Sequence, residues 1–198
     1  MDHHAMECWK NHCSFYFRQD LSDCRVLLSQ NPQNPHVDML LFPPGAAYPF
    51  YKLCTMGASD YRLPFSRPHE FIMFLAREED LSCDQTLMWY RDVLLTVALY
   101  PARNHFAVGF GHSIVWGAQP GTDMCSAYLD LPYPIEGPGF FNCRLGPLRK
   151  TACLQVTLLT DSETQELIRQ GPGKFCDFLY PPEGKPHFLC QRYRNSLF

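Results

Sequence analysis

Two groups of residues in this sequence are suited to chemistry, a histidine in a glycine-rich run and a set of N-terminal histidines and cysteines. His112 lies in the run Gly109–Ser113, where two glycines permit positive φ angles and the close approach of another chain. The run lacks the third glycine of a dinucleotide-binding loop, because Ile114 occupies that place. It also lacks the Gly-x-Ser-x-Gly pattern of a nucleophile elbow. We interpret His112 as a turn residue that borders a binding surface. A hydrolase that pairs it with a cysteine or an aspartate is the alternative.

The N-terminal stretch MDHHAMECWKNHC is the only part of the chain with the composition of a metal site. His4, Cys8 and His12 are spaced four residues apart and would line one face of a helix. A zinc site also needs a fourth ligand and a fixed helix, whereas terminal segments often fray. We therefore predict no metal and no other cofactor, and a metal-stabilised adaptor is a further alternative that zinc stoichiometry would test.

Composition excludes several classes of function. The chain has 198 residues and a formal net charge of -3, so it lacks the basic surface that binds nucleic acid or an anionic membrane. No apolar run reaches the roughly 18 residues that a membrane helix needs, and the N-terminus lacks the pattern of a secretory signal. Ten cysteines occur without a C-x-x-C pair, and we interpret them as reduced core thiols. These features predict a cytoplasmic protein.

Apolar runs predict strands at His36–Phe42, Phe50–Met56, Glu70–Leu75, Met124–Leu131 and Thr151–Leu159. The first two are joined by a short connection that contains Pro43-Pro44-Gly45, which favours an antiparallel hairpin. Glu70–Leu75 is almost continuously apolar, so we expect a central strand that is covered on both faces.

Helical spacing occurs near the N-terminus, where one face would hold Met6, Trp9, Cys13 and Phe17. The capping-box pattern Ser82-x-x-Gln85, with Asp84 as a competing N-cap, predicts the start of a helix that Pro101 ends. A second pattern, Thr160-x-x-Glu163, predicts a helix that ends at Gly171, with a short aromatic helix over Phe175–Tyr180 after it. The stretch Asn31–Pro35, NPQNP, reads as a loop.

This order of elements predicts an α+β domain with one mixed, largely antiparallel sheet covered by helices. No repeat and no linker divides the chain. We assign residues 1–33 to an N-terminal helical segment of the same domain, residues 34–180 to the main domain and residues 181–198 to a C-terminal tail.

Four segments, in order, resemble those of the Suppressor of fused domain family. HVDMLLFPP and FYKLCTMGASDY resemble a strand with an internal Asp and a second strand that enters the turn Thr55–Asp60. RPHEFIMFL resembles the family's acidic-apolar strand, with Glu70 at the acidic position. Tyr100–Arg103 and Gly111–Ser113 resemble its helix end and Gly-His-Thr turn. LQVTLLTDSETQELIRQG resembles its strand before an acidic helix start. The resemblance covers roughly residues 34–180.

The resemblance implies a non-enzymatic protein-binding domain of the Suppressor of fused fold. The family's namesake restrains a zinc-finger transcription factor of animal Hedgehog signalling, and grips a short peptide as an added strand. Single-domain bacterial members imply a different role, that of an immunity protein that binds and neutralises a cognate polymorphic toxin. We therefore expect a bacterial, cytoplasmic protein whose partner is another protein, and neither nucleic acid nor a membrane.

Candidate contacts to that partner come from turns, loops and a helix end. Loop aromatic residues are frequent anchors of protein interfaces, although each could also thicken the core. We select Asp60, Tyr61, Arg103, Phe110, His112 and Trp116.

Overall fold

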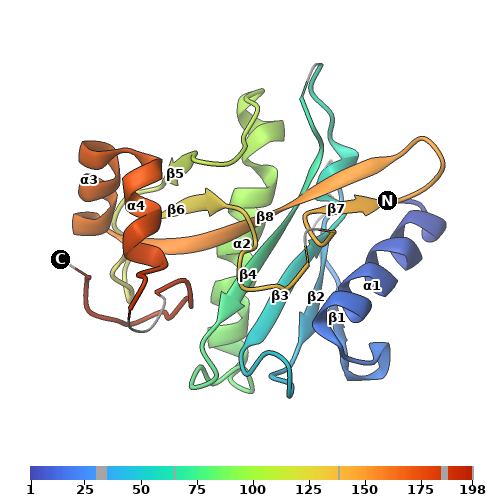
Figure 1. The fold of residues 1–198 in the computed structure, drawn as a ribbon, viewed down its shortest axis with the longest axis horizontal. Helices are drawn as coiled ribbons and strands as arrows, with labels where there is room; N and C mark the ends of the chain where they lie inside the picture. The colour runs from blue at the N-terminus through green and yellow to red at the C-terminus, as the bar shows by residue number, and fades with distance from the viewer. Residues whose placement is uncertain (30–34, 65, 138, 184–186, 198) are drawn as a thin grey trace.

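One mixed sheet lies at the centre of the computed structural model, which describes residues 1–29, 35–64, 66–137, 139–183 and 187–197 (Figure 1). The order across the sheet is β1-β2-β3-β4-β8-β6-β5, and β7 pairs with β8 outside this path. The strands are β1 (Arg25–Leu27), β2 (Asp38–Phe42), β3 (Tyr51–Met56), β4 (His69–Leu75), β5 (Ser113–Val115), β6 (Met124–Asp130), β7 (Asn142–Arg144) and β8 (Lys150–Thr160).

The strand pairing confirms the predicted fold class. Neighbouring strands run antiparallel, except for the parallel pair β4 and β8. β2 and β3 form the expected hairpin, with Leu40 opposite Cys54. β4 lies between β3 and β8 and is buried from Glu70 onward, which explains why its sequence is almost continuously apolar. β1 and β5 lie at the two edges of the sheet.

Helices cover both faces of this sheet (Figure 1). Within the described residues they are α1 (His3–Phe17), α2 (Asp84–Asn104), α3 (Asp161–Gln170) and α4 (Pro172–Leu179), with the 3-10 turns η1 (Leu21–Asp23) and η2 (Ala58–Asp60). α2 packs on one face, whereas α1 and α4 pack on the other. The chain is therefore α+β with a sheet between two helical layers.

Strict alternation along the strands divides the core between these layers. In β2, Met39 and Leu41 join the apolar cluster under α2, while Leu40 and Phe42 face α1. Farther along the sheet, Tyr128 of β6 packs against α4. Successive side chains of a strand point to opposite faces, so each strand feeds both clusters.

Pro101 does not end α2, contrary to the sequence prediction. The helix continues through Asn104 and stops at His105, which has a left-handed φ of 50°. Proline lacks one N–H group, so at the last turn it removes a single hydrogen bond and the helix tolerates it. The N–H groups of His105 and Phe106 both donate to the Pro101 carbonyl and close this end.

The two predicted helix starts had different outcomes. The capping box at Thr160 is confirmed, because Glu163 N donates to Thr160 Oγ1 at 3.4 Å and Thr160 N donates to Glu163 Oε2 at 2.9 Å. The box at Ser82 and the competing N-cap at Asp84 are both wrong, since the N-cap residue is Cys83 and Asp84 is the first residue of α2. The Ser82 hydroxyl instead donates to Asp80 Oδ1 at 2.5 Å, an acceptor two residues away in the preceding turn.

The N-terminal helix has the expected buried face. Trp9, Cys13 and Phe17 are buried, and the Trp9 indole donates to the Thr55 carbonyl at 2.8 Å. The predicted loop Asn31–Pro35 falls largely on residues 30–34, which lie outside the described residues. The boundaries assigned at residues 33 and 180 stay predictions.

Candidate functional site

A buried carboxylate holds the turn that follows β3. Glu70 is fully buried, and its Oε2 accepts the hydroxyl of Thr55 at 2.6 Å. Its two oxygens also accept the backbone N–H groups of Gly57–Ser59 at 3.1–3.3 Å. Burial raises the pKa of the Glu70 carboxyl above its usual value, and these hydrogen bonds offset part of that rise. Because both oxygens are engaged, Glu70 is a structural clamp of the turn.

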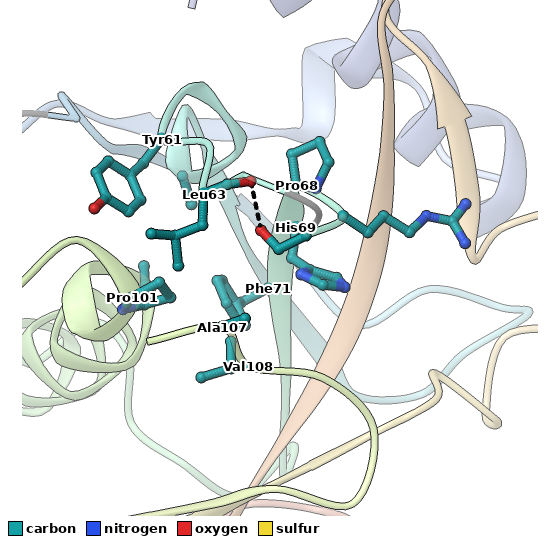
Figure 2. Close-up of a pocket in the computed structure, with 12 residues that line it drawn as sticks. Tyr61, Leu63, Pro68, His69, Phe71, Pro101, Ala107 and Val108 are labelled. Carbon is teal, nitrogen blue, oxygen red and sulfur yellow. Dashed lines mark hydrogen bonds between the residues drawn. The ribbon is translucent and has the colours of Figure 1, made fainter. Parts of the chain in front are cut away.

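A small pocket opens beside this turn, between the loop after η2 and the end of α2 (Figure 2). Tyr61 and Leu63 line it from the loop, where the Ser66 hydroxyl donates to the Leu63 carbonyl at 3.2 Å. Pro101 and Val108 line it from the other side. Its volume is about 20 Å³, which is room for about one water molecule. Small-molecule sites enclose several hundred Å³, so this pocket is too small for a substrate.

A hydrogen bond ties the loop at this pocket to the end of α2. The Tyr61 hydroxyl and His105 Nδ1 are 2.9 Å apart. Arg103 is exposed in the last turn of α2, two residues before His105. The structure therefore brings two of the partner-contact candidates, Tyr61 and Arg103, to the same end of one helix.

The segment between α2 and β5 exposes aromatic side chains. The His112 ring is exposed and lies 5.8 Å from the Phe106 ring, measured between centroids. The exposed fractions of Phe106 and Phe110 are 54% and 49%. His112 is tied to the sheet by its backbone, because its carbonyl accepts the N–H of Leu129 at 2.8 Å. The His112 ring faces an aromatic neighbour, not one of the described thiols or carboxylates.

The remaining two candidates lie elsewhere. The Trp116 indole contacts the Met124 carbonyl at 3.4 Å and lines a hollow beside Trp89 of α2. Asp60 forms ion pairs with Arg149 and with the N-terminal ammonium group. The six candidates therefore do not form one site, and Asp60 is engaged within the molecule.

The N-terminal histidines and cysteines do not converge. His4 Nε2 and Cys8 Sγ are 3.6 Å apart, but His12 Nε2 contacts the Phe140 carbonyl at 3.0 Å. The His12 ring stacks on the rings of Trp9 and Phe140, and burial lowers its pKa. In the described part of the chain, no group of three His, Cys, Asp or Glu side chains could hold a metal ion. His12 thus packs α1 onto the segment before β7.

Sequence reasoning missed another buried acid, Asp130 at the end of β6. Its Oδ1 accepts the N–H of Leu131 at 2.7 Å, and its Oδ2 accepts the Cys176 thiol at 3.6 Å. Burial raises the pKa of Asp130 to about 6. The sequence does place Asp130 at the end of an apolar run, but the contact with α4 depends on the tertiary fold. Phe106 was missed too, because the predicted helix ended too early.

The fold and the turn Thr55–Asp60, which Glu70 holds, define a Suppressor of fused-like domain. A crystal structure of the Sufu–Fu complex is similar, with a TM-score of 0.71, 13% identity, and coverage of 97% of this chain and 91% of that chain. A Suppressor of fused homologue from Neisseria gonorrhoeae FA 1090 has a TM-score of 0.70, 11% identity, and coverage of 97% and 96%. Drosophila Suppressor of fused has a TM-score of 0.68 and 13% identity, and the match covers 97% of this chain but 51% of that one.

The chain belongs to the Suppressor of fused family, because the family model for the Suppressor of fused protein (SUFU) matches residues 33–189. This confirms the resemblance carried by the turn, the acidic strand and the helix end. A comparison with curated proteins gives no match. Among the described helices, none combines the length and the apolar character needed to cross a membrane.

Proposed function

We propose that this chain is a non-enzymatic protein-binding domain, and that its partner adds an extended segment to the outer edge of β5. The observation that carries the proposal is the combination of an edge strand with exposed apolar side chains. β5 has one partner strand in the described sheet, β6. The exposed fraction of Val115 is 57%, and the exposed Phe106 and Phe110 precede the strand.

The hydrogen bonding of β5 indicates which backbone groups are available. The His112 carbonyl accepts from Leu129, and the Trp116 N–H donates to the Cys125 carbonyl, so both residues bond toward β6. Antiparallel pairing alternates with a period of two residues, which directs the backbone groups of Ser113 and Val115 outward. Edge strands with unpaired groups are templates for an added strand.

Exposed aromatic side chains supply the second part of the proposed surface. We name the residues Phe106, Phe110, His112 and Val115 the β5 surface. Aromatic anchors contribute a large share of binding free energy at protein interfaces, and an added strand contributes backbone hydrogen bonds. His112 supplies a polar group beside the Phe106 ring. Arg103, exposed at the end of α2, is a further contact for an acidic group of the partner.

The narrower role that we propose is that of a bacterial immunity protein, located in the cytoplasm, which neutralises a cognate toxin. The resemblance to single-domain bacterial members supports it. The net charge of -3 suits a basic toxin, such as a nuclease, by electrostatic complementarity. The test is growth rescue of cells that express the toxin encoded beside this chain's gene, together with co-purification of the two proteins.

A substitution at the strand edge makes this test specific. Val115→Pro removes an outward N–H group and leaves the inward bonds of His112 and Trp116 in place. Val115→Ala removes the side chain and keeps the N–H group, so it is the matched control for the backbone contribution. We expect Val115→Pro to abolish rescue and co-purification at an unchanged melting temperature, and Val115→Ala to weaken them. Full rescue by Val115→Pro would exclude strand addition at β5, and no rescue by the unaltered chain would exclude the immunity role.

A further inference from the structure

Four buried thiols share the face of the sheet that α1 covers. They come from four different elements and belong to one apolar cluster. The cysteines are Cys13 of α1, Cys54 of β3, Cys143 of β7 and Cys153 of β8. All four are free thiols, three of them on strands beneath α1 and one on α1 itself. Two of them could therefore form a disulfide bond.

Contacts on either side of Cys13 fix its place over β3. One helical turn before it, the Trp9 indole donates to the carbonyl of Thr55. One turn after it, the Phe17 ring lies 5.8 Å from the ammonium group of Lys52. Cys13 therefore lies between the two anchors, and Cys54 lies between Thr55 and Lys52 on the strand. Lys52 and Cys54 point to the same face of β3, because they are two residues apart.

Both side chains belong to the apolar cluster between α1 and the sheet, and Cys54 adds to the effect of burial in raising the pKa of the Cys13 thiol. We propose that Cys13 and Cys54 are a disulfide-forming pair that fastens α1 to the sheet. Each is wholly buried, so the reaction proceeds when α1 opens locally and places both sulfur atoms within reach of an oxidant.

The strand order disfavours two alternative pairs within this cluster, Cys54 with Cys153 and Cys143 with Cys153. Cys54 and Cys153 lie on β3 and β8, with β4 between them, so two strand spacings of about 4.8 Å separate them. Disulfide bonds rarely join Cα atoms more than about 7 Å apart. Cys143 lies opposite Thr151, so its relation to Cys153 is a diagonal of about 7–8 Å. Cys13 lies on α1, so a disulfide bond between Cys13 and Cys54 requires no strand of the sheet to move.

The reaction consumes an oxidant of the disulfide class, such as oxidised glutathione, or a diazene such as diamide. With oxidised glutathione, one protein thiolate attacks the glutathione disulfide and releases one reduced glutathione. The second protein thiolate then attacks the mixed disulfide and releases another, so two thiols lose two electrons and two protons. Some disulfides are strongly oxidising because a stabilised thiolate favours their reduced form. Burial raises the pKa of Cys13 and so disfavours its thiolate, which means that this stabilisation is lacking here.

The experiment is oxidation of the full chain with diamide, in a Cys83→Ser background that removes the exposed thiol. Free thiols are then alkylated in denaturant at low pH, and cross-linked peptides are identified by mass spectrometry. We expect a Cys13–Cys54 peptide, and a melting temperature that rises by roughly 5–15 °C and returns on reduction. Cys13→Ala and Cys54→Ala should each lose the cross-link and the rise. Cys125→Ala, which removes another buried thiol, should keep both.

Peptide mapping of the Cys83→Ser chain, with all nine other thiols present, decides the question even if a core variant fails to fold. Cys13 bonded to any cysteine other than Cys54 would overturn the proposal. So would a fully oxidant-treated chain in which Cys13 and Cys54 both carry the alkylating label.

Discussion

Thr55 Oγ1 and Glu70 Oε2 lie 2.6 Å apart and join two segments that are 15 residues apart in the sequence. The bond connects β3 to the central strand β4 and continues into the N–H groups of Gly57–Ser59. From this turn the chain leads to Tyr61, which contacts His105 at the end of α2. A buried carboxylate of the core thus sets the loop that meets the aromatic segment before β5.

Replacing Glu70 by Ala should destabilise the fold by about 3 kcal/mol, because it leaves buried N–H groups without an acceptor. Urea denaturation measures the loss. Glu70→Gln should cost less, since an amide oxygen can still accept one or two of these bonds. The control is Glu78→Ala at an exposed position, with an expected change within about 0.5 kcal/mol. Equal losses at the two positions would contradict the role of Glu70 as a clamp.

The sequence contains both halves of this clamp but not their contact. The turn Thr55–Asp60 and the acidic position Glu70 follow from the family resemblance, and the alternation of β2 and β3 follows from periodicity. Their meeting depends on the pairing of β3 with β4, which no local pattern specifies. The end of α2 was also not predictable from local sequence. Proline breaks a helix in its interior but is tolerated in the last turn, and the sequence does not show that Pro101 lies in the last turn.

The candidate site was less predictable than the fold, because its residues meet through contacts between segments that are distant in sequence. Tyr61 and Arg103 come together only because the loop after η2 returns to the end of α2. Trp116 and Asp60 contact the body of the domain instead. Loop residues were selected by type, while their surroundings are set by contacts that are distant in sequence.

The buried acid Asp130 should make stability depend on pH. Its folded pKa of about 6 lies above the unfolded value of about 3.9, so the charged form is disfavoured in the folded state. Stability from this group therefore rises as the pH falls from about 6 toward 4, by at most about 3 kcal/mol. Asp130→Asn should be more stable than the unaltered chain at pH 7.5, and the difference should vanish near pH 4.

His69 also makes the free energy of unfolding depend on pH, so the effect of Asp130 is measured as the difference in stability between Asp130→Asn and the unaltered chain. Burial lowers the pKa of His69 to about 4, so falling pH protonates the unfolded chain first and reduces stability over a similar range. Chemical denaturation of both proteins at several pH values cancels this contribution. A difference that is constant from pH 4 to pH 7.5 would show that Asp130 does not titrate in this range.

Cys83 should be the fastest of the ten thiols to react with iodoacetamide at pH 7. It is exposed at the start of α2, and the N–H groups of Thr86 and Gln85 lower its pKa. Burial instead raises the pKa of the thiols of Cys13, Cys24, Cys143, Cys153, Cys176 and Cys190. Timed peptide mapping should show labelling of Cys83 roughly ten-fold ahead of these. Equally rapid labelling of Cys24 would contradict the assignment.

The β5 surface should carry binding without carrying stability. Phe110→Ala and His112→Ala remove exposed groups, so each should change the free energy of unfolding by less than about 0.5 kcal/mol. Each should weaken partner binding by roughly ten-fold or more, because aromatic anchors at the centre of an interface contribute about 1–3 kcal/mol. Phe15→Ala is the matched control, since Phe15 is 73% exposed on α1. Titration calorimetry with the partner and thermal denaturation separate the two effects. Equal losses of affinity in all three variants would place the partner elsewhere, and a loss of stability in His112→Ala would make that residue a turn anchor.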